Sequence, residues 1–212
     1  MRTALPRIWI ITNPEHAEGP VAPVVRALEG CPPGSVGVQL RAKHASDREL
    51  VAWGRALRTA TERQSCLLTV NRRSDVAEIV RADGVHLPEA GLASEAIRSE
   101  WPDISLIGTS RHDRDGLLRA VQEQTTFAFL SPIFPVPGKG QAMGVKGFAM
   151  QIADVGMPTY ALGGVGAPHI ASLIAAGAYG IAVRRAICDA ADPKAALQEL
   201  LHALDKTAPN GE

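Results

Sequence analysis

Two turns in this chain join a short apolar segment to glycine and proline. The first spans residues 131–139 (Ser-Pro-Ile-Phe-Pro-Val-Pro-Gly-Lys) and ends in Lys139; the second spans residues 161–165 and contains Gly163 and Gly164. Such turns expose backbone N–H groups, and a nearby lysine adds positive charge. Both features suit a phosphorylated ligand, so the sequence predicts a site for a small anionic metabolite.

Three polar residues alternate where an apolar segment ends: Gln39, Arg41 and Lys43. In an extended segment this spacing places all three side chains on one side. They form either a solvated strand end or a clamp for an anion. The clamp is the more specific interpretation. Neighbouring positive groups repel one another unless a negative group lies between them, so their clustering indicates a site for an anion.

A phosphate site is expected at the late turns of the chain. Gly163 and Gly164 supply backbone donors, and Arg184 and Arg185 follow the last apolar segment. Arginine binds phosphate through two parallel hydrogen bonds, and phosphate often lies at the final turns of a barrel. The alternative is that both arginines are surface residues at the start of a helix.

His112 is the candidate for proton transfer, with Ser110 two residues before it. Imidazole titrates near neutral pH, so it can both accept and return a proton. The competing interpretation is a structural or surface histidine. His86 lies inside an apolar segment and is expected to be a structural, hydrogen-bonded histidine. A metal site is poorly supported, since Glu89 and Asp113 are the few carboxylates near the expected strand ends.

Apolar segments of strand length alternate with amphipathic segments of helix length. Eight strands are expected, at residues 8–12, 36–40, 67–70, 84–87, 106–108, 127–131, 159–162 and 180–183. Helix candidates include residues 47–62, 74–81, 93–101, 115–123, 169–176 and 193–206. Most of the strand segments are continuously apolar, as strands buried on both faces are.

Eight such strand–helix units close into an α/β (β/α)8 TIM barrel, here a single domain over residues 1–212. The rival is an open doubly wound sheet, which would place its ligand-binding glycines after the first strand. The glycine turns follow late strands instead, which favours the barrel. The reaction face of a barrel lies at the carboxyl ends of its strands.

The amino-acid composition argues against nucleic acid as a partner. The 22 basic residues balance 22 acidic ones, and only 4% of residues are aromatic, so nothing favours nucleic acid binding. Three widely spaced cysteines suit free thiols in a reducing compartment. The first apolar run is too short for a signal peptide or a membrane span. These features indicate a soluble cytoplasmic protein; a homodimer is left open.

Six segments together resemble the thiamine phosphate synthase superfamily, which includes the TenI-type thiazole tautomerases. They are residues 39–43 (QLRAK), 82–87 (ADGVHL), 107–112 (IGTSRH), 131–135 (SPIFP), 161–165 (ALGGV) and 177–183 (GAYGIAV). Their order and spacing are specific for the superfamily. The resemblance implies a (β/α)8 barrel, which agrees with the number of predicted strands.

The resemblance also implies roles for residues. The synthase joins an aminopyrimidine methyl diphosphate to a thiazole phosphate and releases pyrophosphate, with Mg²⁺ as cofactor. By resemblance, the diphosphate substrate would contact Gln39, Arg41, Lys43, Asn71 and Lys139, and the thiazole phosphate would contact Gly164 and the backbone near Arg184 and Arg185.

The metal ligands of the family do not carry over. Arg72 stands where an aspartate usually follows the asparagine, and Gly91 stands at the second aspartate position. Val136 and Gly138 replace threonines of the proline-rich loop. Either Arg72 neutralises the diphosphate in place of a metal, or the chain binds no diphosphate.

Three functions therefore stay open. The favoured one is a thiazole tautomerase without a cofactor, in which His112 moves a proton while Arg41 and Lys139 hold the substrate carboxylate. The second is the synthase, for which Gln39, Arg41 and Lys43 form a fuller clamp than a tautomerase requires. The third is a non-catalytic protein that binds a phosphorylated ligand of the pathway.

Overall fold

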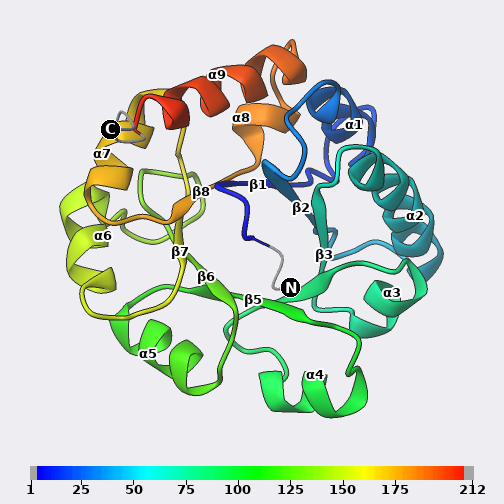
Figure 1. Cartoon of the computed structure of the whole chain (residues 1–212), viewed down its shortest axis with the longest axis horizontal. Coiled ribbons are helices and arrows are strands. Elements are labelled where there is room, and N and C mark those ends of the chain that lie inside the picture. The colour runs from blue at the N-terminus through cyan, green and yellow to red at the C-terminus, as the bar shows by residue number, and fades with distance from the viewer. Residues whose placement is uncertain (1–3, 208–212) are drawn as a thin grey trace.

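The computed structural model describes residues 4–207 and contains a closed barrel of eight parallel strands in sequence order (Figure 1). The strands are β1 (Ile8–Ile11), β2 (Val36–Leu40), β3 (Leu67–Asn71), β4 (Gly84–Leu87), β5 (Leu106–Arg111), β6 (Phe127–Leu130), β7 (Thr159–Leu162) and β8 (Gly180–Val183). Strand β1 pairs with both β2 and β8, which closes the sheet. The predicted (β/α)8 fold is confirmed.

Helices surround the barrel in Figure 1. They are α1 (Ala22–Leu28), α2 (Asp47–Arg63), α3 (Ser74–Ile79), α4 (Ser94–Glu100), α5 (Arg114–Gln122), α6 (Gly144–Ile152), α7 (Ile170–Ala175), α8 (Arg185–Cys188) and α9 (Pro193–Asp205), with a 3₁₀ turn η1 (Ala167–His169) before α7. Helices α1, α6 and α8 are absent from the sequence prediction. Helix α8 is a single turn, and α6 begins with glycine, so neither shows a strong start signal.

Two predicted helix starts are confirmed by their caps. The Ser46 hydroxyl accepts a hydrogen bond from the Glu49 N–H, and the Glu49 carboxylate accepts one from the Ser46 N–H. The Asp192 carboxylate accepts from the Ala195 N–H at the start of α9. Each cap satisfies backbone donors that have no partner within the helix.

The barrel interior is filled by aromatic side chains. Trp9 stacks on Phe127 with ring centroids 4.8 Å apart, and Tyr160 meets Phe127 edge to face at 5.6 Å. Gly37 gives Trp9 its space, because a Cβ atom there would lie 2.5 Å from the indole ring. Large residues opposite small ones thus close the core toward the amino ends of the strands.

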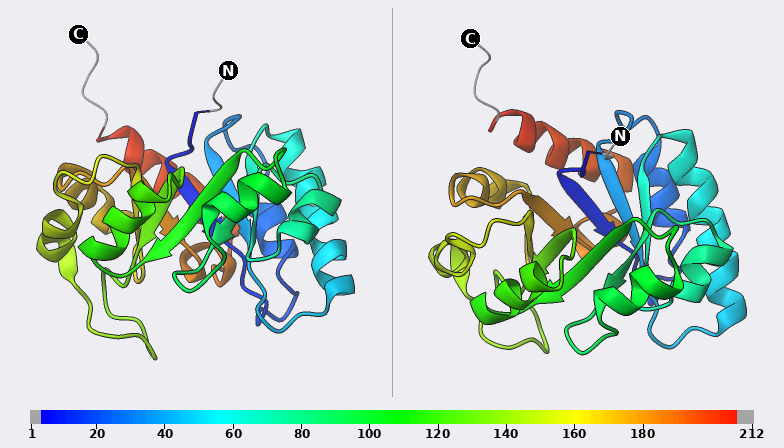
Figure 2. Two further views of the ribbon diagram at one scale, coloured as in Figure 1. Left: turned by 90° about the horizontal axis from the view of Figure 1, so that it is seen from below. Right: turned by 60° about the horizontal axis from the view of Figure 1, so that its bottom comes forward.

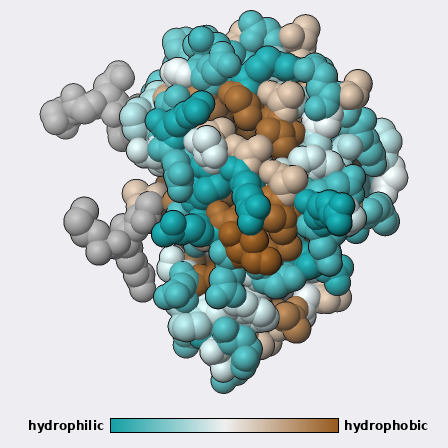
Figure 3. Space-filling model, turned by 90° about the vertical axis from the view of Figure 1, so that its right-hand side faces the viewer, coloured by the Kyte–Doolittle hydropathy of each residue, from teal (hydrophilic) through white to brown (hydrophobic). Residues whose placement is uncertain are grey.

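Each of the longer helices packs an apolar face against the strands, and its opposite face is exposed to solvent. Leu50 and Leu57 of α2, and Leu197 and Leu200 of α9, are buried in this layer. On the side of the barrel that α2 covers, the surface is largely hydrophilic and interrupted by hydrophobic patches (Figure 3). No helix among residues 4–207 combines the length and apolar character that a membrane span needs.

The two ends of the barrel differ in their loops. In Figure 2 the long yellow-green loop between β6 and α6 projects from the end opposite to that at which the N-terminal segment enters. Strand β5 is three residues longer than the sequence predicts, since it continues through Arg111. Ser110 therefore lies within a strand, not in the loop after it.

Candidate functional site

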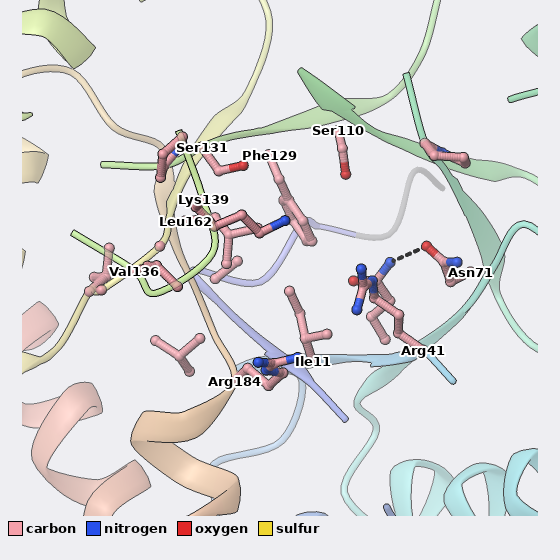
Figure 4. A pocket seen from close by; sticks show the side chains of 18 of the residues that line it. Ile11, Arg41, Asn71, Ser110, Phe129, Ser131, Val136, Lys139, Leu162 and Arg184 are labelled. Atoms are coloured by element: carbon pink, nitrogen blue, oxygen red, sulfur yellow. Dashed lines mark hydrogen bonds between the residues drawn. The ribbon is translucent and has the colours of Figure 1, made fainter. Parts of the chain in front are cut away.

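A cavity of about 510 Å³ opens at the carboxyl ends of the strands (Figure 4). It contains every site residue that the sequence predicts: Gln39, Arg41, Lys43, Asn71, Ser110, His112, Lys139, Gly163, Gly164, Arg184 and Arg185. These residues come from six different strand ends, so only closure of the barrel brings them together. What the sequence analysis missed is the apolar part of the lining, which includes Ile11, Phe129 and Leu162.

Gln39 and Asn71 form a polar pair on neighbouring strands β2 and β3. Gln39 is 1% exposed, and its Nε2 donates to Asn71 Oδ1 at 3.3 Å, the dashed line in Figure 4. The Gln39 Oε1 atom is buried and has no hydrogen-bond partner within residues 4–207. An unpaired buried acceptor is costly, and a ligand N–H group would satisfy it.

Six cationic side chains line the cavity: Arg41, Lys43, Arg72, Lys139, Arg184 and Arg185. None of them lies within 4.0 Å of a carboxylate in the described part of the chain. Lys139 extends toward the middle of the cavity (Figure 4). In a chain with no net charge, this local excess makes a strongly positive cavity that attracts anions.

The mutual repulsion of these cations affects their pKa values. Burial, and then the charge of Arg184, lowers the pKa of the Arg41 guanidinium. The pKa of Lys43 is lowered chiefly by Arg41, with burial, Lys139 and Arg72 contributing after it. The contribution of Arg184 to the first shift, and those of Arg41, Lys139 and Arg72 to the second, reflect a positive potential that a bound anion would relieve.

The glycine turn after β7 is held against the loop after β6. Gly163 and Gly164 have φ values of 103° and 66°, in the left-handed region that favours glycine. A Cβ atom on Gly164 would lie 2.8 Å from the Phe134 Cβ, and the Phe134 N–H donates to the Gly163 carbonyl at 2.9 Å. The turn after β6 and the glycine turn after β7 thus form one wall of the cavity.

His112 lies directly after β5 at the edge of the cavity and is half-exposed. Its Nδ1 is 2.7 Å from the Ser131 carbonyl oxygen, which can only accept a hydrogen bond. In neutral imidazole this leaves Nε2 with the free electron pair, 3.9 Å from a carboxylate oxygen of Glu89. The orientation is compatible with acceptance of a proton at Nε2.

His86 lies beneath Ser110, with its Nε2 2.9 Å from the Ser110 hydroxyl oxygen. It is 1% exposed, and burial, followed by the charges of Arg41 and Arg111, lowers its pKa to about 3. His86 is therefore neutral at pH 7. The predicted hydrogen-bonded histidine is confirmed, and its partner is a residue of the cavity.

The acidic residues do not fit a Mg²⁺ site. Glu89 is the only carboxylate on the described cavity wall, and Arg119 binds it at 3.2 Å. Asp113 instead caps α5 by accepting from the Gly116 N–H at 2.7 Å. Residues 4–207 contain no group of three acidic, histidine or cysteine side chains placed to hold a metal. Mg²⁺ requires oxygen ligands, and the surrounding cations would repel it.

Comparison with known proteins identifies the family. A family model described as thiamine monophosphate synthase matches residues 8–187. The chain belongs to the thiamine monophosphate synthase family. The resemblance seen in six segments of the sequence is thereby confirmed.

Relatives in this family align along nearly the whole chain. A thiamine-phosphate synthase of Vibrio parahaemolyticus is 33% identical over 203 residues, which cover 94% of this chain and 98% of that protein. One of Laribacter hongkongensis is 34% identical, with 91% and 92% covered. The structure of a thiamine phosphate pyrophosphorylase from Pyrococcus furiosus superposes with a TM-score of 0.87 at 29% identity, over 98% of this chain and 99% of that one.

Proposed function

We propose that this protein is a thiamine-phosphate synthase, which joins an aminopyrimidine methyl diphosphate to a thiazole phosphate. The sequence alone favours a tautomerase, but the names of the relatives support the synthase better. The single observation that carries the proposal is the set of six cations around one cavity, none of which pairs with a carboxylate within residues 4–207. The tautomerase substrate, which carries one phosphate and one carboxylate, does not need six cations for its binding.

The lining offers two places for anions. The N–H groups near Gly163 and Gly164, with Arg184 and Arg185, suit a monophosphate on the thiazole. The cations that follow β2 and β3, together with Lys139 of the loop after β6, suit a diphosphate: Arg41, Lys43, Arg72 and Lys139. A volume of about 510 Å³ is within the usual range for small-molecule sites.

The reaction follows from this arrangement. The carbon–oxygen bond to the diphosphate breaks, and its electron pair leaves with pyrophosphate. The thiazole nitrogen supplies the electron pair of the new carbon–nitrogen bond. Cations already in place around the leaving group stabilise the negative charge that develops there. Ile11, Phe129 and Leu162 give the rings an apolar surface, and Gln39 with Asn71 can orient the aminopyrimidine.

The test is release of pyrophosphate from the two substrates with equal formation of thiamine phosphate. Arg41→Ala should lower kcat/KM by about 10- to 100-fold, as expected for one charged hydrogen bond. Arg55→Ala is the matched control, because Arg55 is exposed on α2 and does not line the cavity. No pyrophosphate release by the wild-type protein, with or without Mg²⁺, would rule out the synthase.

A second candidate is the thiazole tautomerase, favoured by the orientation of His112. Its Nδ1 is held by the Ser131 carbonyl, and its Nε2 makes no hydrogen bond within residues 4–207, so Nε2 can remove a ring proton and return one to the exocyclic carbon. General acid–base catalysis contributes about 10²- to 10⁴-fold in rate, so His112→Ala should lose that much tautomerase activity. Full activity of His112→Ala would exclude this role. Ligand binding without either reaction would indicate the non-catalytic protein.

A further inference from the structure

Arg72 and Arg73 are adjacent in the chain but differ in their contacts with carboxylates. Arg73 binds the Asp47 carboxylate at 2.5 Å and the Asp75 carboxylate at 2.6 Å. Arg72 lines the cavity and contacts no carboxylate in the described part of the chain. One charge of this turn is thus neutralised within the protein, and the other is left for a ligand.

The backbone holds Arg72 in this position. Its φ is 66°, in the left-handed region, which costs a residue other than glycine roughly 1 kcal/mol. The Arg72 N–H donates to the His86 carbonyl at 3.0 Å, and the Arg73 N–H donates to the Asn71 carbonyl at 2.9 Å. The turn therefore presents Arg72 beside Asn71 at the cavity wall.

Lys43 belongs to the same cluster, because Arg41, Lys139 and Arg72 all act on its ammonium group. None of these four cations has an anionic partner within the described residues, and the only lining carboxylate, Glu89, is bound by Arg119. The charge that would draw a divalent cation into a site is missing here. The charge that a polyphosphate needs is already supplied by side chains.

We propose that Arg72 and Lys43 bind the diphosphate oxygen atoms directly and that the protein binds pyrophosphate without a divalent cation. This inference rests on the proposed function and specifies how its leaving group is held. Arg72 offers two parallel N–H donors to phosphate oxygens, and Lys43 a compact positive charge. Mg²⁺ neutralises part of the charge of pyrophosphate, so excess Mg²⁺ should weaken binding or leave it unchanged.

The experiment is calorimetric titration of the whole protein with inorganic pyrophosphate, in EDTA and in excess MgCl₂. The wild type should bind in EDTA at least as tightly as in MgCl₂. Arg72→Gln and Lys43→Gln should each weaken binding in EDTA by about 10- to 100-fold. Arg73→Gln, in the same turn, is the matched control, and it should lower Tm without changing the pyrophosphate affinity.

Two results would overturn the inference. One is binding that requires MgCl₂, and the other is an unchanged affinity in EDTA in a folded Arg72→Gln or Lys43→Gln variant. Because Lys43 follows β2 and Arg72 follows β3, the two substitutions are in different loops, and if one variant fails to fold the other still tests the inference. The proposed function is tested separately: metal-free binding with no pyrophosphate release from the two substrates would contradict the synthase alone. Pyrophosphate release that requires Mg²⁺, with no binding in EDTA, would contradict this inference alone.

Discussion

The amino and carboxyl ends of the barrel are built from the same eight strands but filled in opposite ways. Near the amino ends, Trp9, Phe127 and Tyr160 pack ring against ring and are fully buried. Toward the carboxyl ends, positions in the same inward-facing register carry Gln39 and Ser110. One end is a closed core, and the other is an open polar cavity.

The two ends also differ in how their charged side chains are paired. Asp83, just before β4, binds Arg58 at 2.8 Å and accepts a hydrogen bond from the Leu68 N–H at 2.7 Å. At the opposite end, Arg184 is close enough to Arg41 to lower its pKa, and within residues 4–207 neither arginine lies within 4.0 Å of a carboxylate. Substitutions at the amino end should therefore reduce stability, and those at the carboxyl end should reduce binding.

The largest expected effect is at the aromatic core. Phe127→Ala should lower the free energy of unfolding by about 3–5 kcal/mol, because it removes a fully buried ring and leaves a cavity. Chemical denaturation measures this loss. The folded fraction should keep its pyrophosphate affinity. A loss well below about 1 kcal/mol would mean that the core relaxes around the deletion.

His86 links the two ends and should make stability depend on pH. Its pKa is about 3 in the folded protein, against an ordinary value of 6.5, so between these values the unfolded chain binds a proton that the folded protein does not. Stability is therefore lost as pH falls from 6.5 toward 3, by at most about 1.4 kcal/mol per pH unit.

His86→Gln should make this dependence shallower, as measured by denaturation at several pH values between 7 and 4. His202→Gln on the exposed side of α9 is the matched control and should keep the wild-type slope. An unchanged slope in His86→Gln would show that other groups dominate acid unfolding.

A smaller effect is expected at the paired charge near the amino ends. Asp83→Asn should lower the free energy of unfolding by roughly 1–2 kcal/mol, because a charged acceptor of two hydrogen bonds becomes a neutral one. Thermal unfolding measures the change, and pyrophosphate binding should not respond. A drop in affinity without a drop in Tm would place Asp83 with the functional residues instead.

The smallest expected effect on stability is at the cavity. Arg41→Gln should leave Tm unchanged or raise it slightly, because it removes a partly buried cation that Arg184 and Lys43 repel. The same variant should bind pyrophosphate more weakly. A clear fall in Tm would mean that Arg41 stabilises the barrel, and the contrast between the two ends would fail.

Much of the site could be predicted because its signals are local. Apolar runs of strand length gave eight strands, and the alternation of Gln39, Arg41 and Lys43 placed them on one face. The end of β5 was missed, because residues 109–111 are polar and do not look like a buried strand. Pairing with β6, where Arg111 lies opposite Leu130, extends β5 over those residues.

The sequence by itself determined the barrel, its glycine turns and the set of residues at its mouth, because hydrophobic periodicity and turn chemistry act over a few neighbouring residues. Only the tertiary structure decided which charges have partners. Arg73 is neutralised by Asp47, 26 residues away in the chain, whereas Arg72 next to it contacts no carboxylate among the residues that the structure describes. Electrostatic interactions depend on distance in space, and the closed barrel sets those distances.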